Sequence, residues 1–156
     1  MEVEFINPFI IGALEIFEKV ASIELKKTDV KMLKGTRPSN EIGIAFGVFG
    51  YIIGQVVYSF KTHTAERVVS SMMPNSSVEK QKEYFESALG ALANMITGRA
   101  TILLAGKEQV IRITPPLIIM QSTTDTFQYI NSPTISIIFT SRFGSLEINI
   151  ALRQTK

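Results

Sequence analysis

Cysteine is absent from this 156-residue chain, and histidine occurs only once, at position 63. A chain without thiols forms no disulfide, binds no zinc through sulfur and has no thiolate nucleophile. His63 has no cluster of carboxylates near it in the sequence, so we interpret it as a solvated loop residue at a strand-to-helix turn. We therefore expect the chain to hold no metal ion and no cofactor of its own.

Long runs of one charge are missing as well. The chain has 16 Lys and Arg against 14 Asp and Glu, a net charge of +2, and its basic residues are scattered. Nucleic-acid binding calls for gathered basic residues interleaved with aromatics, so we expect no nucleic-acid partner. The apolar segment near the N-terminus is interrupted by Glu15 and Glu18, and it predicts neither a signal peptide nor a membrane span. These absences favour a cytoplasmic protein without membrane contact.

The apolar content of the chain is sufficient for one core. Hydrophobic residues make up 46% of the sequence, and this length predicts a single domain over residues 1–156. The expected elements, in order, are a helix that begins at Asn7-Pro8 and runs to about residue 20, a polar connection over 26–40, strands over 41–49 and 51–60, a short helix over 64–73, a long helix from Ser76-Ser77 to about Leu104, and strands over 109–114, after Pro115-Pro116, over 134–140 and over 145–153.

The two halves of the chain repeat the same order of elements. Gly12-Ala13-Leu14 in the first helix is echoed by Gly90-Ala91-Leu92 in the long helix, and each half later has a hairpin whose turn carries Phe-Gly. The last strand alternates apolar and polar residues, which is typical of a sheet with one face packed on helices. We predict an α+β fold in two layers, with a mainly antiparallel sheet of about six strands, two long helices on one face and an internal pseudo-repeat.

The long helix has two unlike sides. At 100° per residue its large apolar residues gather within about 60° of Leu92, and they are Phe85, Leu89, Ile96 and Leu103. The opposite side, centred on Asn94, carries the small residues Ser87, Gly90, Ala91, Thr97, Gly98 and Thr101. Glycine inside a helix costs roughly 0.5–1 kcal/mol relative to alanine, so this composition needs a cause. Two explanations remain open: close packing within the chain, or a partner protein into which Asn94 reaches.

The segment SALGALANMITGRA, residues 87–100, resembles the signature helix of the CheC/CheX family of chemotaxis phosphatases. In that motif Asp or Ser is followed after three residues by Glu, and after two more by Asn. The likeness covers most of the chain, because FINPFIIGALEIF, GYIIGQVVYSF and FTSRFGSLEINIAL are similar to the family's opening helix, first hairpin and closing hairpin. By the Gly-Ala-Leu echo, Ile16 stands where a second Asn would be, so the single site is similar to CheX and not to two-site CheC.

The resemblance implies a CheC/CheX-like fold and a protein that binds a phosphorylated CheY-type response regulator and hydrolyses its aspartyl phosphate. Asn94 would be the catalytic residue that orients the attacking water, and the regulator would supply its own Mg²⁺. The docking face would comprise Ser87, Gly90, Ala91, Thr97 and Gly98. The family likeness also implies a homodimer formed by joining sheet edges, for which an exposed edge strand is a suitable template.

One position departs from the motif. The family Glu, which is expected to pair with the regulator's active-site lysine, is Ala91 here. Glu86 lies about 12 Å along the helix axis from Asn94 and about 80° away around it, so it cannot take that place in the same docking pose. The sequence leaves open whether the chain turns over substrate. The alternatives are a regulator-binding scaffold module without turnover, and a structural homodimer whose small-residue face packs within itself.

Overall fold

The computed structural model describes residues 3–35, 40–120 and 132–155. Its elements are the 3₁₀ helix η1 (Val3–Phe5), the helices α1 (Ile6–Ala21), α2 (Thr62–Met72), α3 (Val78–Glu83) and α4 (Phe85–Leu104), and the strands β1 (Lys26–Leu33), β2 (Ile42–Gly50), β3 (Ile52–Phe60), β4 (Ile111–Ile113), β5 (Leu117–Met120), β6 (Thr134–Ser141) and β7 (Gly144–Gln154).

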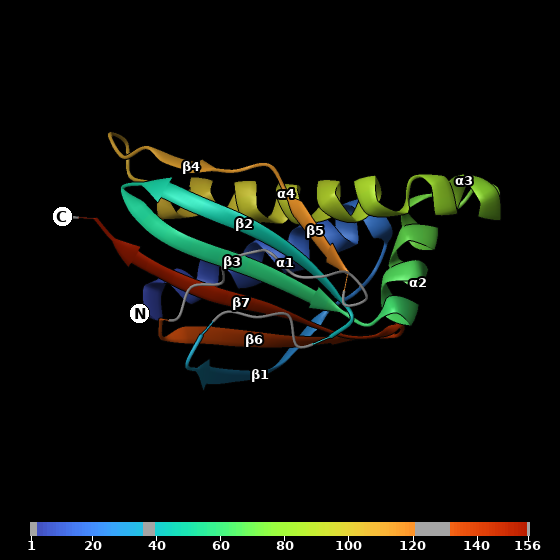
Figure 1. Ribbon diagram of the computed structural model, residues 1–156, viewed down its shortest axis with the longest axis horizontal. Helices are drawn as coiled ribbons and strands as arrows, with labels where there is room; N and C mark the ends of the chain where they lie inside the picture. The colour runs from blue at the N-terminus through green and yellow to red at the C-terminus, as the bar shows by residue number, and fades with distance from the viewer. Residues whose placement is uncertain (1–2, 36–39, 121–131, 156) are drawn as a thin grey trace.

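The described strands form one sheet. Its order is β1-β6-β7-β3-β2-β4, with β5 also paired to β2, and every pairing is antiparallel. The two expected hairpins, β2–β3 and β6–β7, meet at the centre through the β3–β7 pair. Figure 1 shows α1 and α4 on one face of this sheet, with α2 and α3 at one end. The predicted α+β fold with its antiparallel sheet and two long helices is confirmed.

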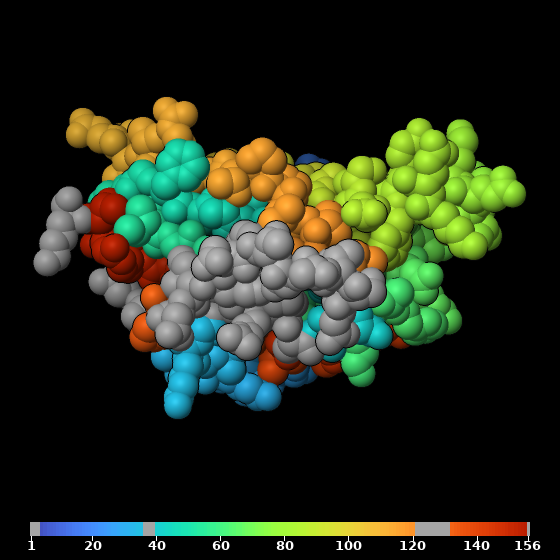
Figure 2. Space-filling view, viewed as in Figure 1, coloured from blue at the N-terminus to red at the C-terminus, as the bar shows by residue number. Residues whose placement is uncertain are grey.

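The strand β1 corrects the prediction of a polar connection over 26–40 and raises the strand number from six to seven. Its sequence, KKTDVKML, has no apolar alternation, and all of its residues except Leu33 are exposed. As an edge strand it is held by its backbone pairing with β6, so burial leaves no pattern in its sequence. Figure 2 shows β1, in blue, at one margin of the molecule.

The long helix is shorter than expected because it is preceded by a separate turn of helix. Ser77 caps α3, accepting a hydrogen bond from the Lys80 amide at 3.2 Å, so of the two serines at the expected helix start Ser77 is the cap. The backbone of Tyr84 then departs from helical geometry, with φ −98° and ψ 11°, and α4 begins after it. This break separates α3, which has no buried residue, from the core helix α4.

The core lies between the sheet and the helix pair. Its largest fully buried side chains include Phe9 and Phe17 of α1, Phe46 and Tyr58 of the β2–β3 hairpin, and Leu89 of α4. Among the described residues α4 is the one helix long and apolar enough to cross a membrane by composition, and here it packs on α1 and the sheet. The fold therefore explains its apolar side by burial.

Contacts with α1 fix the position of α4. A Cβ atom added to Gly12 would lie 3.1 Å from the carbonyl oxygen of Ile96, so the two helix backbones approach closely at this crossing. On the outer side, Arg99 Nε lies 3.0 Å from Glu15 Oε2, and both side chains are partly exposed. The side of α4 that faces away from both contacts is left uncovered.

Candidate functional site

Four residues of α4 form an exposed line along the helix, and we refer to them as the outer stripe: Ser87, Ala91, Asn94 and Gly98. Their spacing of four, three and four residues places them on one side of an α-helix. Ser87, Ala91 and Asn94 are exposed, and Gly98 is partly exposed. Within the described residues the Asn94 side chain makes no hydrogen bond or ion pair, so its amide keeps its donors and its acceptor.

Two residues predicted for the same face are buried, and their placement on the docking face is wrong. A Cβ atom added to Gly90 would lie 3.3 Å from Pro116 Cγ, because the segment before β5 covers this flank of α4. Thr97 is 0% exposed. Its hydroxyl lies 2.6 Å from the hydroxyl of Tyr58, which projects from β3. Both positions serve packing of α4 and not contact with a partner.

Apolar side chains accompany the outer stripe on one side. Met95 is 36% exposed and Ile102 is 68% exposed, and helical geometry places both about 80–100° around α4 from Asn94. The Ser87 hydroxyl donates to the Tyr84 carbonyl at 3.1 Å, which turns a polar group back towards its own backbone. The outer face of α4 is thus small and largely apolar around one exposed amide.

No carboxylate stands on the outer stripe itself. Ala91 stands at the position where the motif has Glu. Glu86 lies on another side of the helix, and Glu15 of α1 is paired with Arg99. Among the described residues no group of three His, Asp or Glu could hold a metal ion. His63 is exposed, as expected of a solvated residue, but it lies in the first turn of α2 and not in a loop. The outer stripe therefore carries no charged group, and its polar groups are the Asn94 amide and the Ser87 hydroxyl.

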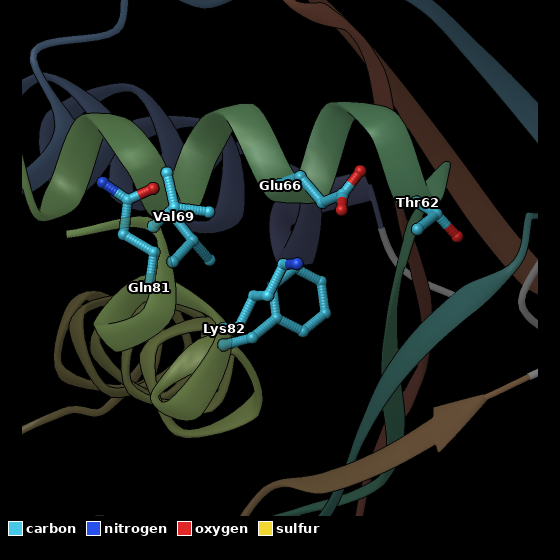
Figure 3. Close-up of a pocket in the computed structure, with 7 residues that line it drawn as sticks. Thr62, Glu66, Val69, Gln81 and Lys82 are labelled. Atoms are coloured by element: carbon cyan, nitrogen blue, oxygen red, sulfur yellow. The ribbon is translucent and has the colours of Figure 1, made fainter.

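A separate hollow of about 450 Å³ lies between α2, α3 and the start of α4. Its walls include Val69 and Phe85, and in Figure 3 Glu66 of α2 and Lys82 of α3 project into the space between the two helices. None of the outer-stripe residues lines it. The hollow is therefore a feature distinct from the Asn94 surface.

The sequence matches the family model of the chemotaxis phosphatase CheX over residues 42–140, more than half of the chain. The protein belongs to the CheX family. The matched region includes the whole of α4, and so every residue of the outer stripe. The helix α1, which fixes the position of α4, lies outside it.

Known proteins extend this likeness. The chain is 29% identical over 119 residues, 76% of its length and 77% of the relative's, to the CheY-P phosphatase CheX of Thermotoga maritima. The fold resembles CheX of Desulfovibrio desulfuricans, with a TM-score of 0.79, 20% identity and coverage of 97% of this chain and 100% of that one. It also resembles the CheX-CheY-BeF3-Mg complex of Borrelia burgdorferi, with a TM-score of 0.72, 21% identity and coverage of 98% and 100%.

We predict different responses to alanine at the two glycines of α4, because they face different neighbours. A Cβ atom at Gly98 would meet nothing within 4 Å, so Gly98→Ala is expected to raise the free energy of unfolding by ~0.5–1 kcal/mol through helix propensity alone. At Gly90 the same change presses on Pro116, so its gain should be smaller or negative. Urea denaturation of the two variants against wild type measures both. Equal gains would contradict the close contact at Gly90.

Proposed function

We propose that this protein binds a phosphorylated CheY-type response regulator through the outer stripe and hydrolyses its aspartyl phosphate. The observation that carries the proposal is the Asn94 amide, exposed and without a partner in the described chain, in the middle of an otherwise small-residue surface. Membership of the CheX family supports the substrate class. The CheY-P phosphatase and the CheX–CheY complex among similar proteins support it further.

In this reaction the phosphatase needs to do little more than position the attacking water. An acyl phosphate is already activated, and the regulator supplies the Mg²⁺ that neutralises charge on the phosphoryl oxygens. Water attacks phosphorus in line, the bond between phosphorus and the aspartyl oxygen breaks, and free carboxylate and inorganic phosphate result. The Asn94 carbonyl accepts a hydrogen bond from the attacking water and so holds it on that line. The amide remains neutral throughout and exchanges no proton.

The rest of the outer stripe suits close approach by a folded partner. Ser87, Ala91 and Gly98 have side chains too short to keep a partner's surface away from the helix, so Asn94 is the residue that projects. Gly98 is destabilising within a helix and nothing in the described fold requires it, which fits a requirement set by the partner. Met95 and Ile102 add exposed apolar surface beside the stripe. A response regulator is an intracellular partner, so the proposal places the protein in the cytoplasm.

Ala91 is the observation that favours a second candidate function. The motif carboxylate would add a charge-assisted contact to the regulator. Such an ion pair contributes almost nothing to binding where it is exposed to solvent, and several kcal/mol where it is desolvated. A chain that lacks it and retains the small face could bind regulator as a scaffold without rapid turnover. We place hydrolysis first because the amide that performs it is present and exposed.

We further propose that two copies join through β1. This strand is eight residues long and forms one edge of the sheet, and Val30 and Met32 on it are exposed. The opposite edge consists of two short strands, β4 and β5, separated by a segment that contains Pro115 and Pro116. Proline cannot donate to a ladder, so β1 is the better template for a second chain.

Replacing Asn94 by Ala is expected to remove the acceleration. Loss of phosphate from a phosphorylated CheY-type regulator of the same genome should fall to the regulator's own rate, while binding to the beryllofluoride-bound regulator stays within about threefold, ~0.7 kcal/mol. Glu86→Ala, an exposed change on the same helix but off the stripe, is the matched control and should keep the wild-type rate. Wild-type turnover in Asn94→Ala would refute the catalytic assignment.

Ala91→Glu is expected to raise the rate of regulator dephosphorylation by about tenfold, equivalent to ~1.4 kcal/mol, because it restores the missing charge at the interface. Ala91→Gln has the same length without the charge and should change the rate far less. Both are compared in the same phosphate-release assay. Identical rates for Ala91→Glu and wild type would show that the regulator docks in a different pose.

The β1 interface predicts different results for two neighbouring proline substitutions. In an antiparallel strand the amides of successive residues point to opposite sides, so of Val30 and Lys31 one faces β6 and the other faces the open edge. Proline at the outward position should give a monomer with near wild-type thermal stability, and proline at the inward position should lower stability as well. Light scattering and circular dichroism measure both properties. A monomeric wild type would refute the interface.

A further inference from the structure

A hydrogen bond between two buried side chains joins α4 to the sheet. Tyr58 of β3 and Thr97 of α4 are both 0% exposed, and their hydroxyl oxygens lie 2.6 Å apart. Thr97 follows Asn94 by three residues, which places it about 4.5 Å along the helix axis and about 60° around it from the amide. The contact between sheet and helix is therefore close to the proposed reacting group.

The direction of this hydrogen bond follows from the neighbouring one. The Thr97 hydroxyl donates to the carbonyl oxygen of Ala93 at 2.8 Å, which uses its single proton. Tyr58 must then donate to Thr97. Burial raises the pKa of the Tyr58 phenol, so the donor stays protonated. The result is a directed chain from the Tyr58 hydroxyl through Thr97 to the backbone of α4.

The Tyr58 end of this chain is a fixed point. The strand β3 is central, and Tyr58 pairs with Ile44 of β2 on one side and with Ile148 of β7 on the other. Its ring packs edge-on against Phe46, with the centroids 5.8 Å apart and an interplanar angle of 76°. The phenol oxygen therefore cannot move without displacing the middle of the sheet.

Leu89, Leu92 and Ile96 bury the inner side of α4, but apolar contacts are non-directional and permit small rotations about the helix axis. A rotation of about 20° would move a side-chain tip ~6 Å from the axis by ~2 Å. Positional catalysis loses efficiency when reacting groups are displaced by ~1 Å. A directional bond at Thr97 restricts that rotation.

We propose that Tyr58, acting through Thr97, is a positioning residue that sets the rotation of α4 and so aims Asn94 at the regulator's phosphoryl group. The proposal rests on the proposed function of Asn94. It assigns the buried pair a role in the rate of the chemical step in addition to any role in stability.

The test uses Tyr58→Phe, Thr97→Val and the double variant, each close to the original side chain in shape. Thr97→Val leaves the buried Tyr58 hydroxyl without its partner, whereas in Tyr58→Phe the Thr97 hydroxyl still donates to Ala93. The double change removes both hydroxyls, so the double variant should regain most of the thermal stability that Thr97→Val loses. Its kcat for regulator dephosphorylation should nevertheless fall by about tenfold, with KM within about twofold. Thr64→Val is the control, because the buried Thr64 hydroxyl donates to the carbonyl of Phe143, in the turn between β6 and β7, and not to α4. It should lower stability and leave kcat unchanged.

A second measurement separates this proposal from the function on which it rests. Residual dipolar couplings of the α4 amides report the orientation of the helix relative to the sheet, without any regulator present. They should fit one orientation in wild type and a changed or averaged orientation in the double variant. Unchanged couplings, or a stable double variant with wild-type kcat, would overturn the positioning role. If wild type itself accelerates nothing while the couplings change, the proposed function fails and the anchoring of α4 stands.

Discussion

The position of α4 between α1 and the sheet is the constraint on which the rest of the structure depends. Gly12 allows the α1 backbone to lie against Ile96 of α4, and Leu89 and Leu92 are buried in the same core. With one side fixed in this way, helical geometry alone directs Asn94 to the outside. The exposed amide is thus a consequence of where the apolar residues stand, and the surface around it consists of whatever α1 and the segment before β5 leave uncovered.

The two glycines of α4 show that small residues on one helix can have different causes. Gly90 has Pro116 above it, so the fold accounts for the missing side chain. Gly98 has open space around it and lies on the outer stripe beside Asn94, so the described fold does not account for it. Internal packing and a partner surface therefore do not exclude each other as causes of the small residues on this side of α4, and each residue needs its own explanation. Packing explains Gly90 and Thr97, whereas for Ser87, Ala91, Asn94 and Gly98 a partner surface is our proposal.

Apolar periodicity predicted α1, α4 and the two hairpins because each of these elements buries one side. Apolar periodicity did not predict β1, because this edge strand is exposed on both faces and its sequence has no alternation of apolar and polar residues. It also failed to separate the flanks of α4, because the residues that cover Gly90 and Thr97 come from β3 and from the segment before β5, distant in sequence. The helical angle of a side chain does not show which other elements of the fold pack against it. Asn94 is exposed, as its angle predicts, because it lies on the side of α4 directly away from the buried apolar residues.

Because Ala91 replaces the motif carboxylate, the orientation of Asn94 relative to the regulator depends more on the protein's own fold. A carboxylate on the outer stripe would form a directional bond to the regulator and would help to align the two proteins. Without it the contact surface beside Asn94 consists of short side chains with Met95 and Ile102, and apolar contact fixes distance better than angle. The direction of the amide must then be set from beneath, by the crossing at Gly12 and by the hydrogen bond that Tyr58 donates to Thr97. For this reason the buried polar pair should matter more to the reaction in this chain than it would beside an intact motif.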